Sequence, residues 1–210
     1  MSTLERIASH LERGEHDEVR TLTEAALGET LSAPDILEQG LIAGMQVVGE
    51  QFRNHEIFLP DVLMAAKAMN AGLEVLEPHL GTTAVPTQGT VVIGTVKGDL
   101  HDIGKNLVGI MLSGAGFEVI DLGKDVSPER FVDAAAESGA NVIGMSALLT
   151  TTMPAMKSVV DLVRERGLGA RTVIGGAPVT KEYADEIGAD GYSFDAANAV
   201  ECIRELTQRS

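Results

Sequence analysis

From residue 90 onward, short apolar runs typical of strands alternate five times with runs typical of helices. Uniformly apolar strands predict a parallel sheet with helices on both faces, because a parallel strand is buried on both sides. Right-handed crossovers favour the order 2-1-3-4-5 for five strands, with a switch point between the first and third. The predicted class is α/β with a flavodoxin-like (Rossmann-like) sheet. The expected strands are 91–96, 117–122, 141–146, 171–175 and a weaker 189–193, and the expected helices are 105–113, 128–138, 154–166, 180–187 and 196–208.

The loop after the first strand places a carboxylate and an imidazole two residues apart, at Asp99 and His101, between Gly98 and Gly104. Open parallel sheets bind ligands where strands end near the switch point, so this loop is a candidate site. A carboxylate at this spacing can hydrogen-bond one ring nitrogen, which fixes the tautomer and leaves the other nitrogen for a metal. Alternatively, Asp99 caps the following helix and His101 is a solvated loop residue; the spacing does not decide between the two.

The loop after the third strand, from Ser146 to Thr152, carries four hydroxyl groups, which is more than one helix cap requires. By the switch-point argument these groups face the same crevice as His101. After the fourth strand, Gly175 and Gly176 form either a tight turn or a bare backbone surface against which a flat ligand lies. Each signal is weak alone, but together they predict one ligand-binding edge of the sheet.

The first eighty residues show helical periodicity, with short helices expected near 4–11 and 17–27. A third helix is expected after Ser32 with Pro34 in its first turn, and a fourth from about Pro60. Apolar stripes spaced by three or four residues run along the two long helices and predict an antiparallel four-helix bundle over 1–80. The stripes are Leu37, Leu41, Met45, Val48 and Phe52, and Val62, Ala66, Met69, Leu73 and Leu76. The segment 81–89, GTTAVPTQG, predicts a linker that lets the bundle move against a second domain over 90–210.

The formal net charge of -15 argues against nucleic-acid and anionic-membrane partners, which require a basic surface. The N-terminus lacks the apolar core of a signal peptide and no window resembles a membrane span, so a cytoplasmic location is expected.

The lone Cys202 excludes an intramolecular disulfide and favours a packing role. The remaining histidines are expected at the surface. They are His10, His16, His55 and His79.

Three motifs together resemble those of cobalamin-binding domains. The segment 99–104 matches Asp-x-His-x-x-Gly, 146–148 matches Ser-x-Leu, and 175–176 matches Gly-Gly, in the family's order after strands one, three and four. The first half resembles the helical cap of cobalamin-dependent methionine synthase in 48–52, VGEQF, and 58–62, FLPDV. In size and organisation the chain is similar to the corrinoid proteins of methanol, methylamine and methoxy-aromatic methyltransferase systems.

The resemblance implies a role for each matching residue. His101 would be the lower axial ligand of cobalt in cobalamin or a related corrinoid, with Asp99 on its other nitrogen and Thr152 continuing the relay. Residues of the later loops would line the slot for the cofactor's nucleotide tail; they are Ser146, Leu148, Thr150, Gly175 and Gly176. The rest of the first loop would also contact the cofactor, through Gly98, Asp102, Ile103 and Gly104. Phe52 and Leu59 in the bundle, the methyl cap, would cover the upper face.

The resemblance further implies a non-catalytic corrinoid subunit that carries a methyl group. It would accept the methyl group on cobalt from a substrate-specific methyltransferase and deliver it to a second methyltransferase that uses tetrahydrofolate or coenzyme M. A reductive activator is a further expected partner. The alternatives are a cobalamin-dependent sensor or regulator, the small subunit of an adenosylcobalamin mutase, and a flavodoxin-like domain that binds no corrinoid.

Overall fold

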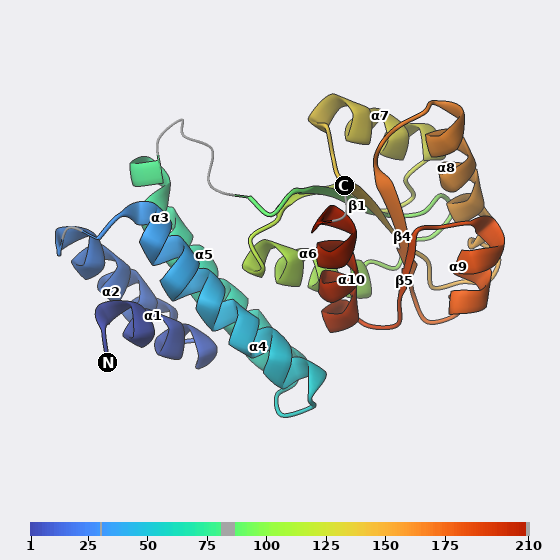
Figure 1. Ribbon diagram of the computed structural model, residues 1–210. Helices are drawn as coiled ribbons and strands as arrows, with labels where there is room; N and C mark the ends of the chain where they lie inside the picture. The colour runs from blue at the N-terminus through green and yellow to red at the C-terminus, as the bar shows by residue number, and fades with distance from the viewer. Residues whose placement is uncertain (30, 81–86, 209–210) are drawn as a thin grey trace. The chain divides into compact units, whose positions relative to one another are not determined.

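The computed structural model describes residues 1–29, 31–80 and 87–208. The chain divides into two compact units, a helical unit that holds the helices up to residue 80 and an α/β unit that begins at Gln88 (Figure 1). The predicted linker 81–89 falls mostly outside the described residues, since 81–86 are not among them. Each unit has its own buried apolar side chains and is described separately.

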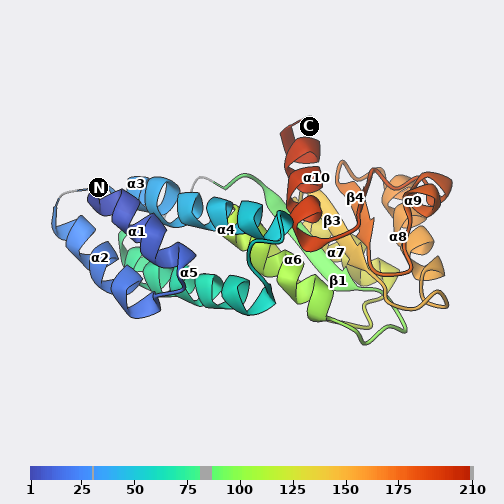
Figure 2. The same cartoon turned by 90° about the horizontal axis from the view of Figure 1, so that it is seen from below.

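The helical unit contains the predicted four-helix bundle. Its first helices are α1 (Thr3–Glu12) and α2 (His16–Gly28), and its last is α5 (Leu59–Leu80). Between them α3 (Ala33–Ile36), η1 (Leu37–Ile42) and α4 (Ala43–Arg53) form one continuous helix (Figure 2). Ser2 caps α1 in a capping box with Glu5, and Ser32 caps α3 ahead of Pro34. Eight of the ten predicted stripe residues are buried, and Phe52 and Leu73 are half-buried.

The segment η1 has π-helical rather than α-helical hydrogen bonds, which the sequence pattern did not predict. Leu37 and Leu41 are both buried in this segment, so their four-residue spacing does not distinguish a π-helix from an α-helix. Two glycines let this long helix approach α1 closely. A Cβ at Gly44 would lie 2.9 Å from the carbonyl oxygen of Ala8, and one at Gly40 would lie 3.2 Å from Ile7.

The α/β unit contains a five-stranded, all-parallel sheet in the order β2-β1-β3-β4-β5, which confirms the predicted topology. Its strands are β1 (Thr90–Thr95), β2 (Glu118–Asp121), β3 (Val142–Ser146), β4 (Arg171–Gly175) and β5 (Gly191–Ser193). The register aligns four strand ends in one row, in which Thr95 pairs with Ser146, Ser146 with Gly175, and Gly175 with Ser193. The loops that follow these residues therefore start at the same edge of the sheet.

Helices cover both faces of the sheet (Figure 1). They are α6 (Ile103–Gly114), α7 (Pro128–Ser138), α8 (Pro154–Glu165), α9 (Lys181–Ile187) and α10 (Ala196–Gln208). The main apolar core joins α7, α8 and α9 to one face, where the buried ring of Phe131 packs against Gly94 of β1. On the other face Gly109 of α6 lies against Ile93 of β1, and α10 packs on β4 and β5.

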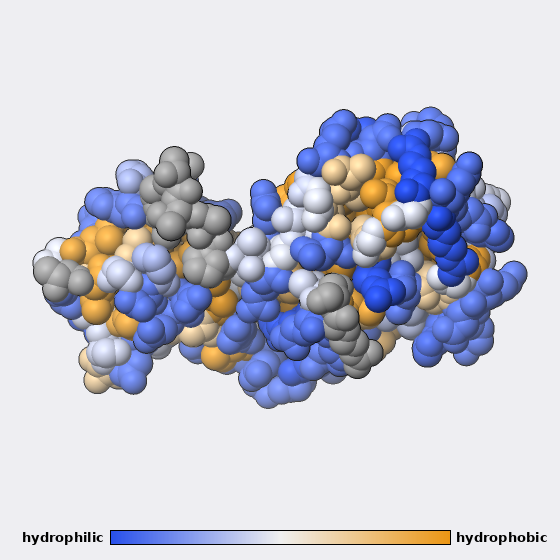
Figure 3. Space-filling view, turned by 45° about the horizontal axis from the view of Figure 1, so that its top comes forward, coloured by the Kyte–Doolittle hydropathy of each residue, from blue (hydrophilic) through white to orange (hydrophobic). Residues whose placement is uncertain are grey.

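Polar side chains cover much of the face that Figure 3 shows, with hydrophobic residues visible between them. Amphipathic helices produce this pattern, because α7, α8 and α10 bury one stripe and present the other to water. Within the described ranges, no helix combines the length and the apolar character that crossing a membrane requires.

The close approach of the end of β4 to the loop after β3 predicts that Gly176 is irreplaceable for stability. Its φ is +131°, and a Cβ there would lie 1.9 Å from the carbonyl oxygen of Ala147. We expect Gly176→Ala to lower the free energy of unfolding by roughly 2 to 4 kcal/mol through strain and overpacking. The matched control Gly169→Ala, where the Cβ meets nothing within 4 Å, should change it by less than about 1 kcal/mol. Urea denaturation measures the free energy of unfolding of both variants, and a Gly176→Ala variant as stable as Gly169→Ala would contradict the prediction.

Candidate functional site

The candidate site is built around Asp99 in the loop between β1 and α6, residues 96–102, here called the His101 loop. The backbone and side chain of Asp99 are fully buried. An ionised carboxylate in such a place requires hydrogen-bond donors on both oxygens, because burial without partners is costly. The structure supplies these donors from two loops that are about fifty residues apart in the sequence.

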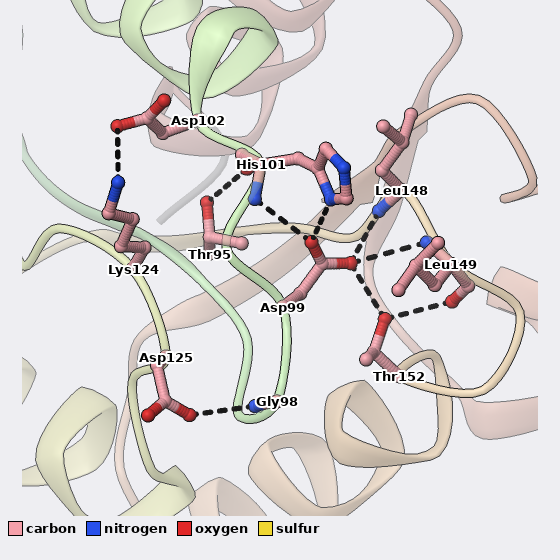
Figure 4. A network of polar contacts seen from close by, with 10 residues as sticks. All are labelled: Thr95, Gly98, Asp99, His101, Asp102, Lys124, Asp125, Leu148, Leu149 and Thr152. Carbon is pink, nitrogen blue, oxygen red and sulfur yellow. Dashed lines mark hydrogen bonds and ion pairs between the residues drawn. The ribbon is translucent and has the colours of Figure 1, made fainter.

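Each carboxylate oxygen of Asp99 has its own set of donors (Figure 4). Oδ1 lies 2.8 Å from Nδ1 of His101 and accepts the backbone N–H of the same residue at 3.1 Å. Oδ2 accepts the backbone N–H groups of Leu148 at 2.8 Å and Leu149 at 3.2 Å, and the hydroxyl of Thr152 at 2.8 Å. The predicted triad of Asp99, His101 and Thr152 therefore meets in space, and Asp99 is not a cap of α6.

These donors also determine the charge of Asp99. Burial by itself raises the pKa of this carboxyl, but the hydrogen bonds from His101, Leu148 and Thr152 outweigh burial and hold the pKa well below its usual range. Asp99 is therefore ionised near neutral pH. The hydroxyl of Thr152 also lies 2.8 Å from the carbonyl oxygen of Leu149, and since it has a single proton, it can donate to only one acceptor at a time.

The ionised carboxylate fixes the tautomer of His101. A carboxylate can only accept a hydrogen bond, so Nδ1 of His101 carries the proton and Nε2 of the neutral ring has a free lone pair. The side chain is 53% exposed, and Nε2 has no partner among the residues that the structure describes. Thr95 fixes the backbone of His101, because its hydroxyl donates to the His101 carbonyl oxygen at 2.9 Å. The arrangement presents one oriented nitrogen ligand.

Exposed apolar side chains follow three strands at this same edge, and we call them the apolar rim. They are Leu100 and Ile103 after β1, Leu148 and Leu149 after β3, and Phe194 after β5. Ile103 is 76% exposed. Next to it, a Cβ at Gly104 would meet nothing within 4 Å, so the start of α6 presents open space. Large apolar side chains exposed together are typical of a binding surface.

The other predicted site residues lie near the same edge of the sheet or in the helical unit. Ser146 and Gly175 are paired neighbours at the ends of β3 and β4, and Thr150 is exposed in the loop that follows β3. The bare backbone of Gly176 accommodates Ala147, which explains the glycine pair by close packing of this chain. Phe52 lies in the last turn of α4 and Leu59 is the first residue of α5, so both belong to the helical unit.

Two charged residues that were not predicted from the sequence support the His101 loop and α6. Asp125, in the loop after β2, accepts the backbone N–H of Gly98 at 2.8 Å. Lys105 is buried on α6, where its ammonium donates to Asn106 at 2.7 Å and pairs with Asp121 at the end of β2. Neither residue belongs to a recognisable motif, since Gly98 lies 27 residues before Asp125 and Asp121 lies 16 residues after Lys105.

The four remaining histidines belong to the helical unit, and the predicted surface position is confirmed for two of them. His55 and His79 are exposed, whereas His10 and His16 are half-buried; His10 pairs with Glu15. Cys202 is half-buried on α10 beside Gly191, and burial raises the pKa of its thiol. A thiol in this state is a packing group rather than a nucleophile.

Comparison with known proteins assigns this geometry to a family. Residues 89–201 match a family described as B12 binding domain, and residues 3–77 match a second family with the same description. The chain belongs to the B12-binding family. A corrinoid protein from Desulfitobacterium hafniense (strain Y51) is 43% identical over 98% of each chain. Dimethylamine corrinoid protein 1 from Methanosarcina acetivorans is 46% identical over 97% of this chain and 96% of its own.

A solved structure extends the comparison. The methanol:cobalamin methyltransferase complex MtaBC from Methanosarcina barkeri contains a chain that matches this B12-binding protein with a TM-score of 0.90 and 34% identity, covering 97% of this chain and 79% of that one. Cobalamin or a related corrinoid is therefore the cofactor of this protein. The residues at the sheet edge fit such a group, because a single oriented imidazole nitrogen stands beside an apolar rim and the open position at Gly104.

The donor set of Asp99 predicts the effect of removing the Thr152 hydroxyl from this B12-binding protein. In Thr152→Val the shape is nearly kept but a charge-assisted hydrogen bond to a buried carboxylate is lost. We expect the free energy of unfolding of the apoprotein to fall by roughly 1.5 to 3 kcal/mol. Thr152→Ser keeps the hydroxyl and should cost about 1 kcal/mol or less. Urea denaturation compares the pair, and a Val variant as stable as the Ser variant would refute the role of the hydroxyl.

Proposed function

We propose that this protein is a corrinoid methyl carrier in which Nε2 of His101 is the lower axial ligand of cobalt. The observation that carries the proposal is the Asp99 network, which buries a charged carboxylate, fixes the His101 tautomer and leaves Nε2 exposed. The names of the relatives support the same function, since they are corrinoid proteins and the MtaBC complex is a methanol:cobalamin methyltransferase.

The residues of this chain orient and tune the ligand nitrogen. Bound cobalamin would supply a cobalt centre that accepts a methyl group and gives it up again. Asp99 makes the His101 ring more basic by accepting the Nδ1 proton, and Thr152 offers that carboxylate a hydroxyl. Because His101 is the exposed end of this relay, its ring can bind or leave while Asp99 stays buried.

The remaining cofactor contacts are proposed from the positions of the residues. The tail slot would be lined at the ends of β3 and β4 by Ser146, Leu148, Thr150, Gly175 and Gly176. The His101 loop and the start of α6 would contact the corrin through Gly98, Asp102, Ile103 and Gly104. We assign the upper, methyl-bearing face to Phe52 and Leu59 of the helical unit, so that residues 1–80 act as the cap, 81–89 as the linker and 90–210 as the cobalamin-binding domain.

The proposed partners follow from the carrier role. A substrate-specific methyltransferase would load the methyl group, as the association of MtaBC suggests for a relative. A second methyltransferase would transfer it to tetrahydrofolate or coenzyme M. A reductive activator would reduce cobalt that had become oxidised. Protein loaded with a labelled methyl group should transfer the label to tetrahydrofolate or coenzyme M only when a methyltransferase that uses that acceptor is added. Retention of the label with both acceptors and their methyltransferases would argue against the carrier role.

The absorption spectrum of the protein loaded with methylcobalamin tests the ligand assignment. We expect His101→Ala to retain corrinoid yet show a shifted spectrum, because a pocket buries most of a bound cofactor's surface and a single ligand would supply little of that contact. His79→Ala, which removes an exposed histidine of α5, should be indistinguishable from the wild type. An unshifted spectrum in His101→Ala would exclude the assignment, and a variant without any corrinoid would contradict the division between ligation and affinity.

The open position at Gly104 separates cofactor binding from folding. A Cβ there meets nothing within 4 Å in the protein, and replacing a helical glycine by alanine usually stabilises by roughly 0.5 to 1 kcal/mol. If the corrin lies on this surface, Gly104→Leu should leave the apoprotein folded and weaken cobalamin binding by about tenfold or more. Gly169→Leu is the matched control. Titration with cobalamin measures both, and equal affinities would place the corrin elsewhere.

A further inference from the structure

The loop after β2 is fixed to the end of β1 by backbone hydrogen bonds. The N–H of Thr95 donates to the carbonyl oxygen of Gly123 at 2.9 Å, and the N–H of Val126 donates to the carbonyl oxygen of Thr95 at 3.0 Å. A β-bridge between Val96 and Val126 extends this contact. Asp125 lies between Gly123 and Val126 in the sequence, so its backbone is held firmly beside the His101 loop.

Asp125 contacts the His101 loop through two different groups, its carboxylate and its backbone N–H, and Figure 4 shows the contact of the carboxylate. Its carboxylate accepts the backbone N–H of Gly98 at 2.8 Å, and its own backbone N–H donates to the carbonyl oxygen of Asp99 at 3.1 Å. Its φ is 55°, a left-handed conformation that is unfavourable for most residues and best tolerated by glycine, asparagine and aspartate. Such a conformation persists where the surrounding contacts compensate for it.

We propose that Asp125 is a positioning residue for His101, holding the backbone of Gly98 and Asp99 in the conformation in which the imidazole can ligate cobalt. The proposal rests on the proposed function, because it assigns Asp125 a role in that same site. Asp125 does not touch the imidazole, and its action passes through the Asp99 backbone.

The side chain and the backbone of Asp99 are held by two different loops, the loop after β3 and the loop after β2. The loop after β3 binds the Asp99 carboxylate through Leu148, Leu149 and Thr152, whereas Asp125 binds the Asp99 backbone. Without Asp125, the carboxylate would remain attached while the backbone on the Gly98 side lost its support. The carboxylate of Asp125 is charged near neutral pH, since the N–H of Gly98 and the ammonium of Lys97 lower its pKa.

Two substitutions separate the hydrogen bond from the backbone conformation. Asp125→Asn keeps an oxygen that can accept the Gly98 N–H and tolerates the left-handed φ, so it should behave like the wild type. Asp125→Gly tolerates the same φ more easily but has no acceptor. We expect Asp125→Gly to favour, by roughly 5- to 20-fold, conformations of the His101 loop in which His101 is not positioned to bind cobalt. This factor is the range for the loss of one partly exposed hydrogen bond.

The first measurement uses protein loaded with cob(II)alamin and compares electron paramagnetic resonance spectra. Nitrogen splitting from an axial imidazole reports the ratio of His101-on to His101-off protein. We expect this ratio to fall 5- to 20-fold in Asp125→Gly and to stay near the wild-type value in Asp125→Asn. Asp133→Asn, which removes a carboxylate of α7 paired with Arg166 just after α8, controls for the loss of one charge.

The second measurement uses the apoprotein and does not depend on the cofactor. Hydrogen exchange of the Gly98 amide, read by nuclear magnetic resonance, should accelerate in Asp125→Gly by the same factor while global stability is compared by urea denaturation. The proposal is overturned if Asp125→Gly matches the wild type in either measurement, or if Asp125→Asn loses as much as Asp125→Gly. If His101→Ala leaves the nitrogen splitting unchanged, the ligand assignment fails, and Gly98 exchange still decides whether Asp125 holds the loop.

Discussion

The architecture of the site depends on one buried charge, the carboxylate of Asp99. Burial opposes its ionisation, and only the donors around it reverse that effect. Those donors come from loops after β1 and β3, which the sheet order makes neighbours. The parallel sheet is therefore more than a scaffold, because its register brings Leu148 and Thr152 to a residue about fifty positions earlier. A strand order without β1 beside β3 would leave Oδ2 of this carboxylate without the donors Leu148, Leu149 and Thr152.

Much of this arrangement was predictable from the sequence, for identifiable reasons. Apolar strands and right-handed crossovers left few topologies, so the contact between the loops after Val96 and Ser146 followed from the strand order alone. The Asp99 and His101 pair was visible because both residues lie in one loop. Local spacing left open whether Asp99 was a helix cap, and only its contacts with Leu148 and Thr152 in the loop after β3 excluded that interpretation.

The features that the sequence did not predict depend on contacts between segments. Asp125 belongs to no motif, and its importance follows from the bridge between Val126 and Val96, which places it beside Gly98. The π-helical segment η1 preserves the apolar stripe, so periodicity cannot detect it. Gly176 was recognised as part of a motif, yet the carbonyl group of Ala147 that excludes a side chain there lies on another strand's loop.

The hydrogen-bond pattern also bears on how His101, as the proposed cobalt ligand, would bind and leave reversibly. Oδ2 of Asp99 has three donors that do not involve His101, and Oδ1 additionally accepts the His101 backbone N–H. If the imidazole turns away, Asp99 loses one contact out of five and stays both charged and satisfied. The penalty for an unpaired buried charge is thereby avoided when His101 leaves. A carboxylate whose only partner was the imidazole would oppose release, so the additional donors would allow the proposed ligand His101 to leave without exposing Asp99 to that penalty.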